Sequence, residues 1–265
     1  ELMKFVEAGN LYRGAKPGMW SPVEKTALAE AEVEYEDITS TQIDVAFEIV
    51  ESPIEELVGA HAVIWTTTPW TIPVNQALAY GPEIEYRRVQ FWASHDSGQS
   101  SDFLDESELW FCGNNESSPS FLVADALKNE VADRLTKIAR GKFPDRGITI
   151  GAVHPDDDRV IKGSDLAGTK VRHPMHKLGG FYETLRPMLP GDFVTTDSGT
   201  GLVHMAPDHG EDDFDLCKTV SIEPVFAVMD DGRQFQRAGR ADLFGPSRRG
   251  RCAFRQPGLS ALLPA

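Results

Sequence analysis

Short apolar segments that Gly and Pro repeatedly interrupt limit this chain to a fold built mainly from short strands. Residues 42–50 alternate apolar and polar side chains, as a half-buried strand does, and residues 85–92 repeat the pattern. Residues 60–67 are rich in Val, Ile, Trp and Thr, which favours a buried strand ending at Pro69. Further short strands are expected at residues 121–123, 148–153, 170–172, 193–196 and 202–205.

Helices are expected at three places in the chain. Residues 26–32 are rich in helix formers and follow Ser21 and Pro22, and another helix begins near Glu211. The longest helix, residues 124–139, repeats apolar side chains with the spacing of one buried face: Ala124, Leu127, Val131, Leu135 and Ile138. The chain has no regular strand–helix–strand alternation, no GxGxxG and no Walker loop. We therefore predict an α+β, β-rich fold, in which a curled, barrel-like sheet carries inserted helices.

Charge and composition limit the kinds of partner that this chain is expected to bind. A formal net charge of −15 argues against a broad nucleic-acid surface, because phosphate binding needs clustered Lys and Arg. No apolar run approaches the roughly 18 residues that span a bilayer, so we expect no membrane partner. The N-terminus lacks a secretory pattern and an initiator Met, which indicates a piece of a longer chain. The three separated cysteines suit thiols in a reducing cytoplasm.

The first segment that carries chemistry is the run TTTPWTIPVN, residues 66–75, which follows Trp65. A strand delivers three consecutive hydroxyls, Thr66, Thr67 and Thr68, to a point where two prolines prevent further regular pairing. Hydroxyls both donate and accept, so such a cluster can hold a water or a sugar hydroxyl. An ordinary Thr-rich strand end followed by a proline turn has the same pattern.

The second segment is GTGLVHMAPDHGEDDF, residues 199–214, where two His lie near four carboxylates. Metal ligation is one interpretation, but Pro207 and Gly210 keep His204 and His209 from sharing a helical face. A hydrolytic dyad, with His as base and Asp as its orienting partner, is a second interpretation. A third is that the acids merely favour the positive end of the helix beginning near Glu211.

Taken together, the two segments resemble the editing insertion of class I aminoacyl-tRNA synthetases for branched aliphatic amino acids. Thr68 stands where the valyl and leucyl members have Arg, so the resemblance is to the isoleucyl type. The stretch YRGAKPGMWSPVEKTALAEAEVEYED, residues 12–37, is also similar to the family, and the likeness covers roughly residues 10–225. The signatures of the synthetic site, HIGH and KMSKS, are absent.

The resemblance also implies a domain organisation. Residues 1–40 would be a segment that connects to the synthetic domain, and residues 41–232 would be the editing domain. Residues 233–265 contain seven Arg and one Asp and depart from the family, which leaves disorder as one interpretation of this tail. Residues 93–119, rich in Ser, Gly and Asn, would form a long surface excursion. Trp20 is followed by Ser-Pro-Val-Glu where many members have CxxC, so no metal is expected there.

Residue by residue, the resemblance implies these roles. Asp213 would bind the α-ammonium of a misattached valine, and His204 would line the side-chain pocket and contact the terminal adenosine. Thr66, Thr67 and Thr68 would position the hydrolytic water and the ester. Trp65 would form a wall of the pocket, and Asn75 would fix the loop or the ribose.

The function implied is post-transfer editing, the hydrolysis of mischarged valyl-tRNA for isoleucine. The reaction would be substrate-assisted and would need no metal or cofactor in this domain, whereas the full-length enzyme would use ATP and magnesium. The partners would be the 3′ terminal aminoacyl-adenosine of the tRNA and the rest of the synthetase, in the cytoplasm. The alternatives are a metal-dependent hydrolase using His204, His209 and Asp213, and an inactive module that binds the end of a tRNA.

Overall fold

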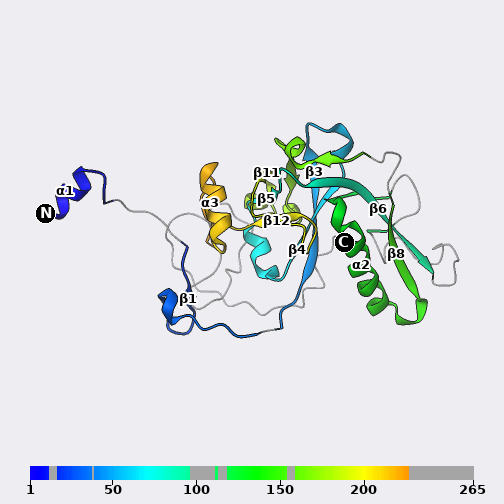
Figure 1. Ribbon diagram of the computed structural model, residues 1–265, viewed down its shortest axis with the longest axis horizontal. Coiled ribbons are helices and arrows are strands. Elements are labelled where there is room, and N and C mark those ends of the chain that lie inside the picture. The colour runs from blue at the N-terminus through cyan, green and yellow to red at the C-terminus, as the bar shows by residue number, and fades with distance from the viewer. Residues whose placement is uncertain (12–16, 38, 96–110, 113–117, 154–158, 227–265) are drawn as a thin grey trace.

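One mixed sheet of ten strands makes up the body of the computed structural model, which describes residues 1–11, 17–37, 39–95, 111–112, 118–153 and 159–226. The strands are β1 (Trp20–Ser21), β2 (Thr26–Ala27), β3 (Ile43–Glu51), β4 (His61–Thr66), β5 (Ala77–Tyr80), β6 (Glu85–His95), β7 (Phe121–Ala124), β8 (Ile148–Val153), β9 (Ile161–Lys162), β10 (Lys170–Arg172), β11 (Arg186–Pro190) and β12 (Leu202–Met205). The α-helices are α1 (Leu2–Glu7), α2 (Lys128–Lys142) and α3 (Glu211–Thr219) (Figure 1). Short 3₁₀ turns lie at Glu30–Glu32, Glu55–Leu57, Pro69–Val74, Asp125–Leu127, Pro144–Arg146, Gly163–Leu166, His176–Leu178 and Gly180–Glu183. None of the helices described has the length and apolar character that crossing a membrane requires.

The sheet curls so that strands far apart in its order become neighbours. The order is β12-β5-β11-β10-β3-β4-β7-β6-β8, and β9 pairs with β6. The β5–β11 and β4–β7 pairs are parallel, and the other pairs are antiparallel. β12 nevertheless lies against β4, across the inside of the curl. Among the described strands the two ends of the path, β12 and β8, do not pair, so the curl is open. The predicted α+β, β-rich fold with a curled sheet and inserted helices is confirmed.

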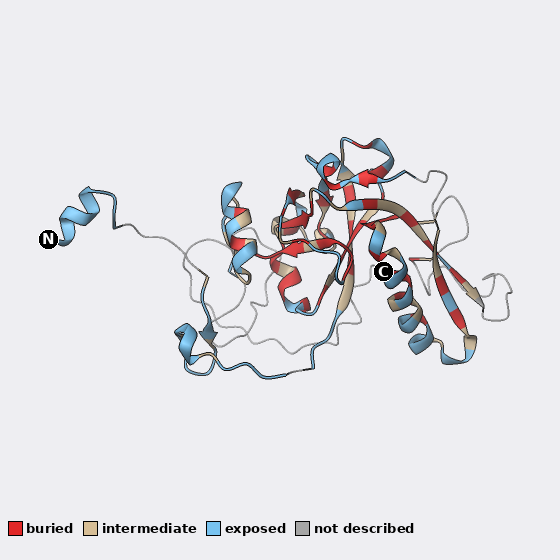
Figure 2. Cartoon of the chain, in the orientation of Figure 1, coloured by how far each residue is buried: buried red, intermediate tan, exposed pale blue. Residues whose placement is uncertain are grey.

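Strand alternation divides the core into an inner and an outer part. On β4, Ala62 and Ile64 face the interior of the curl, where they pack with Phe47 of β3. Val63 faces the other way and packs in the cluster that contains Val131 of α2. Figure 2 shows the buried residues of α2 on the side that faces the sheet. α2 thus covers the outer face of the sheet beside the end of β4.

The prediction of a helix at residues 26–32 is wrong. β1 and β2 form a hairpin there, and only Glu30–Glu32 is helical, as a 3₁₀ turn. Lys25 turns the chain with a φ of 56°, in the left-handed region. The apolar side chains of this segment stay exposed, with Trp20 at 47% and Val23 at 83%. A short helix needs tertiary packing to be stable, so helix formers alone do not suffice here.

Two strand assignments differ from the sequence analysis. The sequence analysis misses β5 because all four of its residues are buried between β11 and β12, so the strand shows no alternation of apolar and polar side chains. The prediction of a strand at residues 193–196 is wrong. The strand beside β5 is instead β11, which ends at Pro190. The chain turns away after β11, since the Gly191 N–H donates to the Tyr80 carbonyl and the Val194 N–H donates to Gly191.

The long predicted helix is confirmed as α2, with shifted ends. It begins at Lys128 because Ala124 belongs to β7, and the Ala124 N–H donates to the Thr200 carbonyl at 2.8 Å. Ile138, assigned to the buried face, is 50% exposed. Of the expected surface excursion, residues 96–110 and 113–117 lie outside the described residues, as does the tail from residue 227 onward.

The turn before β12 yields a stability prediction. Gly201 has a φ of +75°, and a Cβ there would lie 2.4 Å from the Ala124 Cβ. Gly168 has a φ of +87° with nothing within 4 Å, so it is the matched control. Gly168→Ala should cost about 1–2 kcal/mol of backbone strain. Gly201→Ala adds overpacking and should cost about 3 kcal/mol or more. Urea unfolding of both variants measures the difference, and equal losses would contradict the close approach.

Candidate active site

The threonine-rich segment lies where β4 ends and the 3₁₀ turn Pro69–Val74 begins. Thr66 faces the interior, on the same side of β4 as Ile64, and is 7% exposed. Thr67 and Thr68 are exposed. The Oγ1 atoms of Thr66 and Thr68 lie 3.1 Å apart, and the Thr68 N–H donates to Thr66 Oγ1 at 3.0 Å. The structure therefore links the hydroxyls of Thr66 and Thr68 directly.

His204 on β12 is held through both of its ring nitrogens. Asn75 Nδ2 lies 2.8 Å from the Ala77 carbonyl, which only an NH₂ group can satisfy, so its second hydrogen points to His204 Nδ1 at 3.3 Å. Nδ1 therefore accepts, and Nε2 carries the hydrogen that it donates to Thr71 Oγ1 at 2.7 Å. Thr71 passes its own hydrogen to the Thr68 carbonyl at 2.8 Å. This chain of hydrogen bonds fixes the neutral tautomer of the imidazole.

Burial keeps His204 neutral. It lowers the pKa of the imidazole to about 4, and the nearby His209 contributes to the shift. A ring with a low pKa and two occupied nitrogens is a weak proton acceptor near neutral pH. His204 is therefore suited to shaping a pocket. The dyad interpretation needs a ring nitrogen that is free to accept a proton, and hydrogen bonds occupy both nitrogens of His204.

Thr71 is a site residue that the sequence analysis misses. It stands three residues after Thr68 in the same Thr-Pro run, and a 3₁₀ turn eclipses side chains at that spacing. Pro69 at the first position of the turn is the signal that could have revealed it.

Asp213 lies in the first turn of α3, close to the end of β12. Its Oδ2 accepts the Ala206 N–H at 2.8 Å, two residues beyond His204. Burial raises the pKa of this carboxyl to about 6, the Ala206 hydrogen bond opposes the rise, and the negative charge of Asp212 adds to it. Glu211 and Asp212 in the same turn are exposed. The helix-end interpretation suits those two acids, whereas Asp213 is the carboxylate turned inward.

Three further groups surround this carboxylate: Asp208 and His209 lie on the loop between β12 and α3, and Trp70 lies in the 3₁₀ turn Pro69–Val74. The His209 ring packs edge-on against Trp70, with ring centroids 4.8 Å apart. Asp208 Oδ2 lies 3.7 Å from His209 Nε2, and burial raises the pKa of Asp208 to about 7. Burial also lowers the pKa of His209. The sequence analysis gives neither Asp208 nor Trp70 a role in the site, although both stand inside its two segments, and it counts Asp208 only among the acids near the start of the helix.

Trp65 lies on the other face of β4 from Thr66. Its ring stands under the Arg134 guanidinium, with the carbon Cζ 5.9 Å from the ring centroid, and against Gly199. Trp65 is therefore separated by the strand itself from the hydroxyls of Thr66 and Thr68. Asn75, by contrast, is fully buried beside His204, as the expected loop-fixing role requires.

The metal-dependent alternative needs His204, His209 and Asp213 to converge as ligands. Within the described part of the chain, no group of three His, Cys, Asp or Glu side chains is arranged to hold a metal ion. Hydrogen bonds already use both nitrogens of His204 and one oxygen of Asp213. The geometry thus offers this alternative no set of ligands.

The raised pKa of Asp213 predicts that this carboxylate destabilises the fold near neutral pH. Between about pH 4 and pH 6 the folded state binds the proton more tightly than the unfolded chain, so the free energy of unfolding falls as pH rises through that window. Asp213→Asn keeps an oxygen for the Ala206 N–H and removes the charge, so it should stabilise the protein by about 1–2 kcal/mol at pH 8.

Urea unfolding at pH 8 and pH 4 checks this prediction. The gain should be mostly lost at pH 4, where the folded carboxyl is protonated and the unfolded one is about half protonated. Asp212→Asn, at an exposed neighbour in the same turn, should change the free energy of unfolding by less than about 0.5 kcal/mol. A loss of stability in Asp213→Asn at pH 8 would contradict the burial argument.

Comparison with known proteins assigns this chain to a family. The model for tRNA synthetases class I (I, L, M and V) matches residues 1–184. The isoleucine–tRNA ligase of Zymomonas mobilis is 50% identical over 236 residues, which cover 88% of this chain and 21% of that protein. The isoleucine–tRNA ligase of Gluconobacter oxydans is 48% identical over 236 residues, with the same two shares of 88% and 21%.

The chain thus spans about a fifth of the length of the curated relatives it matches. Among solved structures, the editing domain of the P. falciparum cytosolic leucyl-tRNA synthetase matches with a TM-score of 0.37 and 13% identity. That match covers 61% of this chain and 47% of the other. The family match and the identities to the ligases show that this chain belongs to the class I tRNA synthetases for isoleucine, leucine, methionine and valine.

Proposed function

We propose that this chain carries the post-transfer editing activity of an isoleucyl-tRNA synthetase, hydrolysing the ester that joins valine to the tRNA for isoleucine. The observation that carries the proposal is the convergence at one end of the curled sheet of linked hydroxyls, a neutral His204 and an inward-turned Asp213. All three come from the two sequence segments that resemble the isoleucyl editing insertion. Residues 41–232 would form the editing domain, and residues 1–40 would connect it to the synthetic domain.

Each group has a role that follows from its chemistry. The free oxygen of Asp213 would accept the α-ammonium of valine in a charge-assisted hydrogen bond. The buried His204 would limit the size of the side-chain pocket. Thr66 and Thr68 would hold the attacking water, because linked hydroxyls offer both donors and acceptors. Thr67 would contribute from the exposed side of the same strand end.

The reaction needs positioning more than a strong base. The water oxygen bonds to the ester carbonyl carbon, the bond from that carbon to the ribose oxygen breaks, and the water gives up a proton that the ribose oxygen finally receives. An aminoacyl ester is already activated, and the neighbouring free ribose hydroxyl can assist the proton transfer. The low pKa of His204 and its two hydrogen bonds agree with this substrate-assisted course. No cofactor enters it, whereas ATP and magnesium would serve the synthetic site of the complete enzyme.

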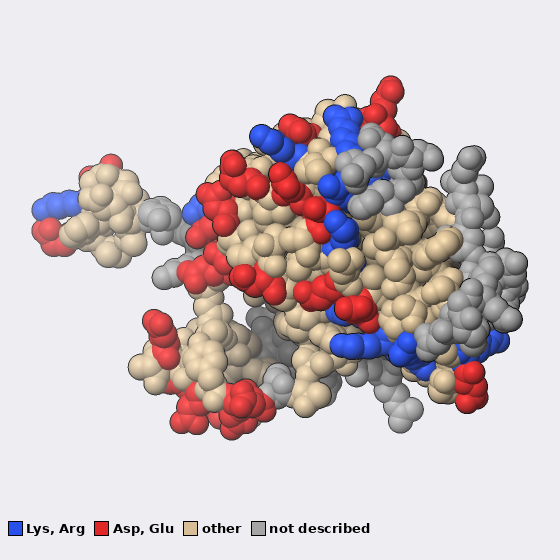
Figure 3. All heavy atoms as spheres, turned by 45° about the vertical axis from the view of Figure 1, so that its right-hand side comes forward, with Lys and Arg blue, Asp and Glu red and all other residues tan. Residues whose placement is uncertain are grey.

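The acidic surface agrees with a small RNA contact. On the face drawn in Figure 3, Asp and Glu side chains gather over much of the surface, and Lys and Arg lie in smaller groups. A chain with a net charge of −15 repels phosphates overall, so the terminal adenosine would be gripped locally. The rest of the synthetase would hold the remainder of the tRNA, in the cytoplasm.

The editing proposal predicts selectivity between two substrates. A hydrophobic pocket separates substrates that differ by one methylene by only about 10–200-fold, as is known for isoleucyl synthetases, so a second and smaller pocket must remove valine. This chain should deacylate valyl-tRNA for isoleucine and spare the isoleucyl form, measured as release of labelled amino acid. Asp213→Asn should lose this activity while remaining folded.

Three results would contradict the editing proposal. Equal hydrolysis of both substrates would remove the selectivity, and hydrolysis that a chelator abolishes would favour the metal-dependent alternative. Tight binding of a non-hydrolysable valyl-adenosine analogue with no turnover of valyl-tRNA would favour the inactive tRNA-end-binding module.

The pH dependence follows from Asp213. Its carboxyl has a pKa of about 6, and only the ionised form pairs with an ammonium, so deacylation should fall as pH drops below about 6. Asp208, with a pKa of about 7, is the nearby group that could confuse the profile. In Asp208→Asn the midpoint of the fall should stay near 6, and a midpoint that moves in this variant would assign the titration to Asp208.

A further inference from the structure

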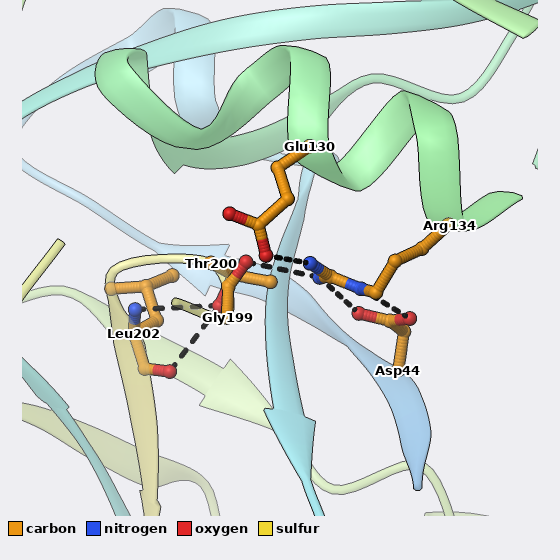
Figure 4. Close-up of polar contacts among 6 residues, drawn as sticks. All are labelled: Asp44, Glu130, Arg134, Gly199, Thr200 and Leu202. Atoms are coloured by element: carbon orange, nitrogen blue, oxygen red, sulfur yellow. Dashed lines mark hydrogen bonds and ion pairs between the residues drawn. The ribbon is translucent and has the colours of Figure 1, made fainter. Parts of the chain in front are cut away.

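Arg134 of α2 joins three separate parts of the chain, and no role is assigned to it in the proposed reaction. Its Nη2 donates to Asp44 Oδ1 at 2.8 Å and to the Gly199 carbonyl at 3.0 Å, and its Nη1 donates to Glu130 Oε1 at 3.0 Å (Figure 4). The side chains of Arg134 and Asp44 are 14% and 13% exposed, whereas that of Glu130 is 47% exposed. The same guanidinium lies over the ring of Trp65.

These contacts meet at the place where β12 lies against β4. Asp44 of β3 is the register partner of Trp65 of β4, so both side chains project from the outer face of the sheet toward α2. Gly199 opens the turn that leads into β12, and a Cβ at this residue would lie 3.5 Å from the Trp65 ring. Arg134 therefore binds the end of the β3–β4 pair and the start of β12 with one planar group.

No backbone pairing holds β12 against β4 among the described strands. Instead, each carbonyl of the turn at residues 199–201 accepts a hydrogen bond from a different element. The Gly199 carbonyl accepts from Arg134, the Thr200 carbonyl accepts from the Ala124 N–H at 2.8 Å, and the Gly201 carbonyl accepts from the Tyr86 hydroxyl at 2.6 Å. We call these three bonds the seam. Only its Arg134 bond comes from a charged side chain.

The seam determines the geometry of the site. Thr66 stands at the last position of β4, and His204 is the third residue of β12, three residues after Gly201. Asp213 is tied in turn to Ala206, just past the end of β12. A shift of the turn at residues 199–201 would therefore move His204 and Asp213 relative to the hydroxyls of Thr66 and Thr68.

We infer that Arg134 is a positioning residue for the reaction proposed above, holding the β12 side of the site against the β4 side through the Gly199 carbonyl. The inference rests on the proposed function for its catalytic consequence, but its structural consequence at the seam is independent of that function. Trp65 contributes to the same positioning, because both Arg134 and Gly199 pack against its ring.

The test uses Arg134→Lys, which keeps the positive charge for Asp44 but loses the planar group that reaches the Gly199 carbonyl and Trp65 together. A displacement of catalytic groups by about 1 Å can cost about 100-fold in rate. We expect kcat for deacylation of valyl-tRNA to fall by about tenfold or more, with KM changed by less than about threefold. Amide hydrogen exchange should become faster at residues 200–206 and stay unchanged in β10 and β11.

Glu130→Gln is the matched control, because it removes only the exposed partner of the same guanidinium. It should leave both kcat and the exchange at residues 200–206 at their wild-type values. For Asp44→Asn, kcat and the exchange rate at residues 200–206 should lie between those of Arg134→Lys and Glu130→Gln, since Arg134 can still donate to the Gly199 carbonyl.

The outcomes separate this inference from the proposed function. Wild-type exchange at residues 200–206 in Arg134→Lys would overturn the inference, and so would faster exchange with an unchanged kcat. If the wild-type chain does not deacylate valyl-tRNA, the proposed function fails, and the exchange data still decide whether Arg134 holds the seam.

Discussion

The contact between β12 and β4, held without ladder hydrogen bonds, is the constraint on which the rest of the structure depends. Four strands separate the two in the order of the sheet, so only the curl brings them together. The turn at residues 199–201, which leads into β12, is held beside this contact by three consecutive carbonyls that accept from donors on α2, β7 and β6. Glycine is required at its ends, because Gly199 and Gly201 have φ values of +88° and +75° and the chain approaches Trp65 and Ala124 closely. The candidate site exists only while this contact holds.

Burial sets the electrostatics of the candidate site, with opposite effects on the pKa values of His204 and Asp213. It disfavours the charged form of each, so the pKa of His204 falls to about 4 and that of Asp213 rises to about 6. A neutral imidazole suits a pocket wall at no electrostatic cost. An ionised Asp213 is costly to keep in the same place, and a bound ammonium would relieve that cost. In the proposed reaction, the site would thus give up stability in the free protein in return for attraction to the ammonium group of the substrate.

The sequence predicts those parts of the fold that depend on local patterns. Alternation marks β3 and β6, and a run of β-branched residues marks β4, so these strands are found at nearly their observed bounds. β5 is buried on both faces and lies between β11 and β12, so its place depends on neighbours distant in sequence. The helix expected at residues 26–32 fails for the opposite reason: its segment is exposed, and helix formers without a buried face are insufficient. The motif resemblance predicts Thr66, His204 and Asp213 as candidate site residues, whereas the contacts of Thr71 with His204 and of Arg134 with Gly199 are created only by the fold.

Trp65 shows why a motif is not a map of substrate contacts. It stands beside Thr66 in the sequence, and adjacency suggests that both line the same pocket. In a strand, however, adjacent side chains face opposite sides, so one of the two must point away. Thr66 points inward, and Trp65 points outward to Arg134 and Gly199. Residues of one motif can therefore contribute to the proposed site from two sides of a strand: Thr66 faces the interior of the curl, and Trp65 packs against Arg134 and Gly199 on the outer face.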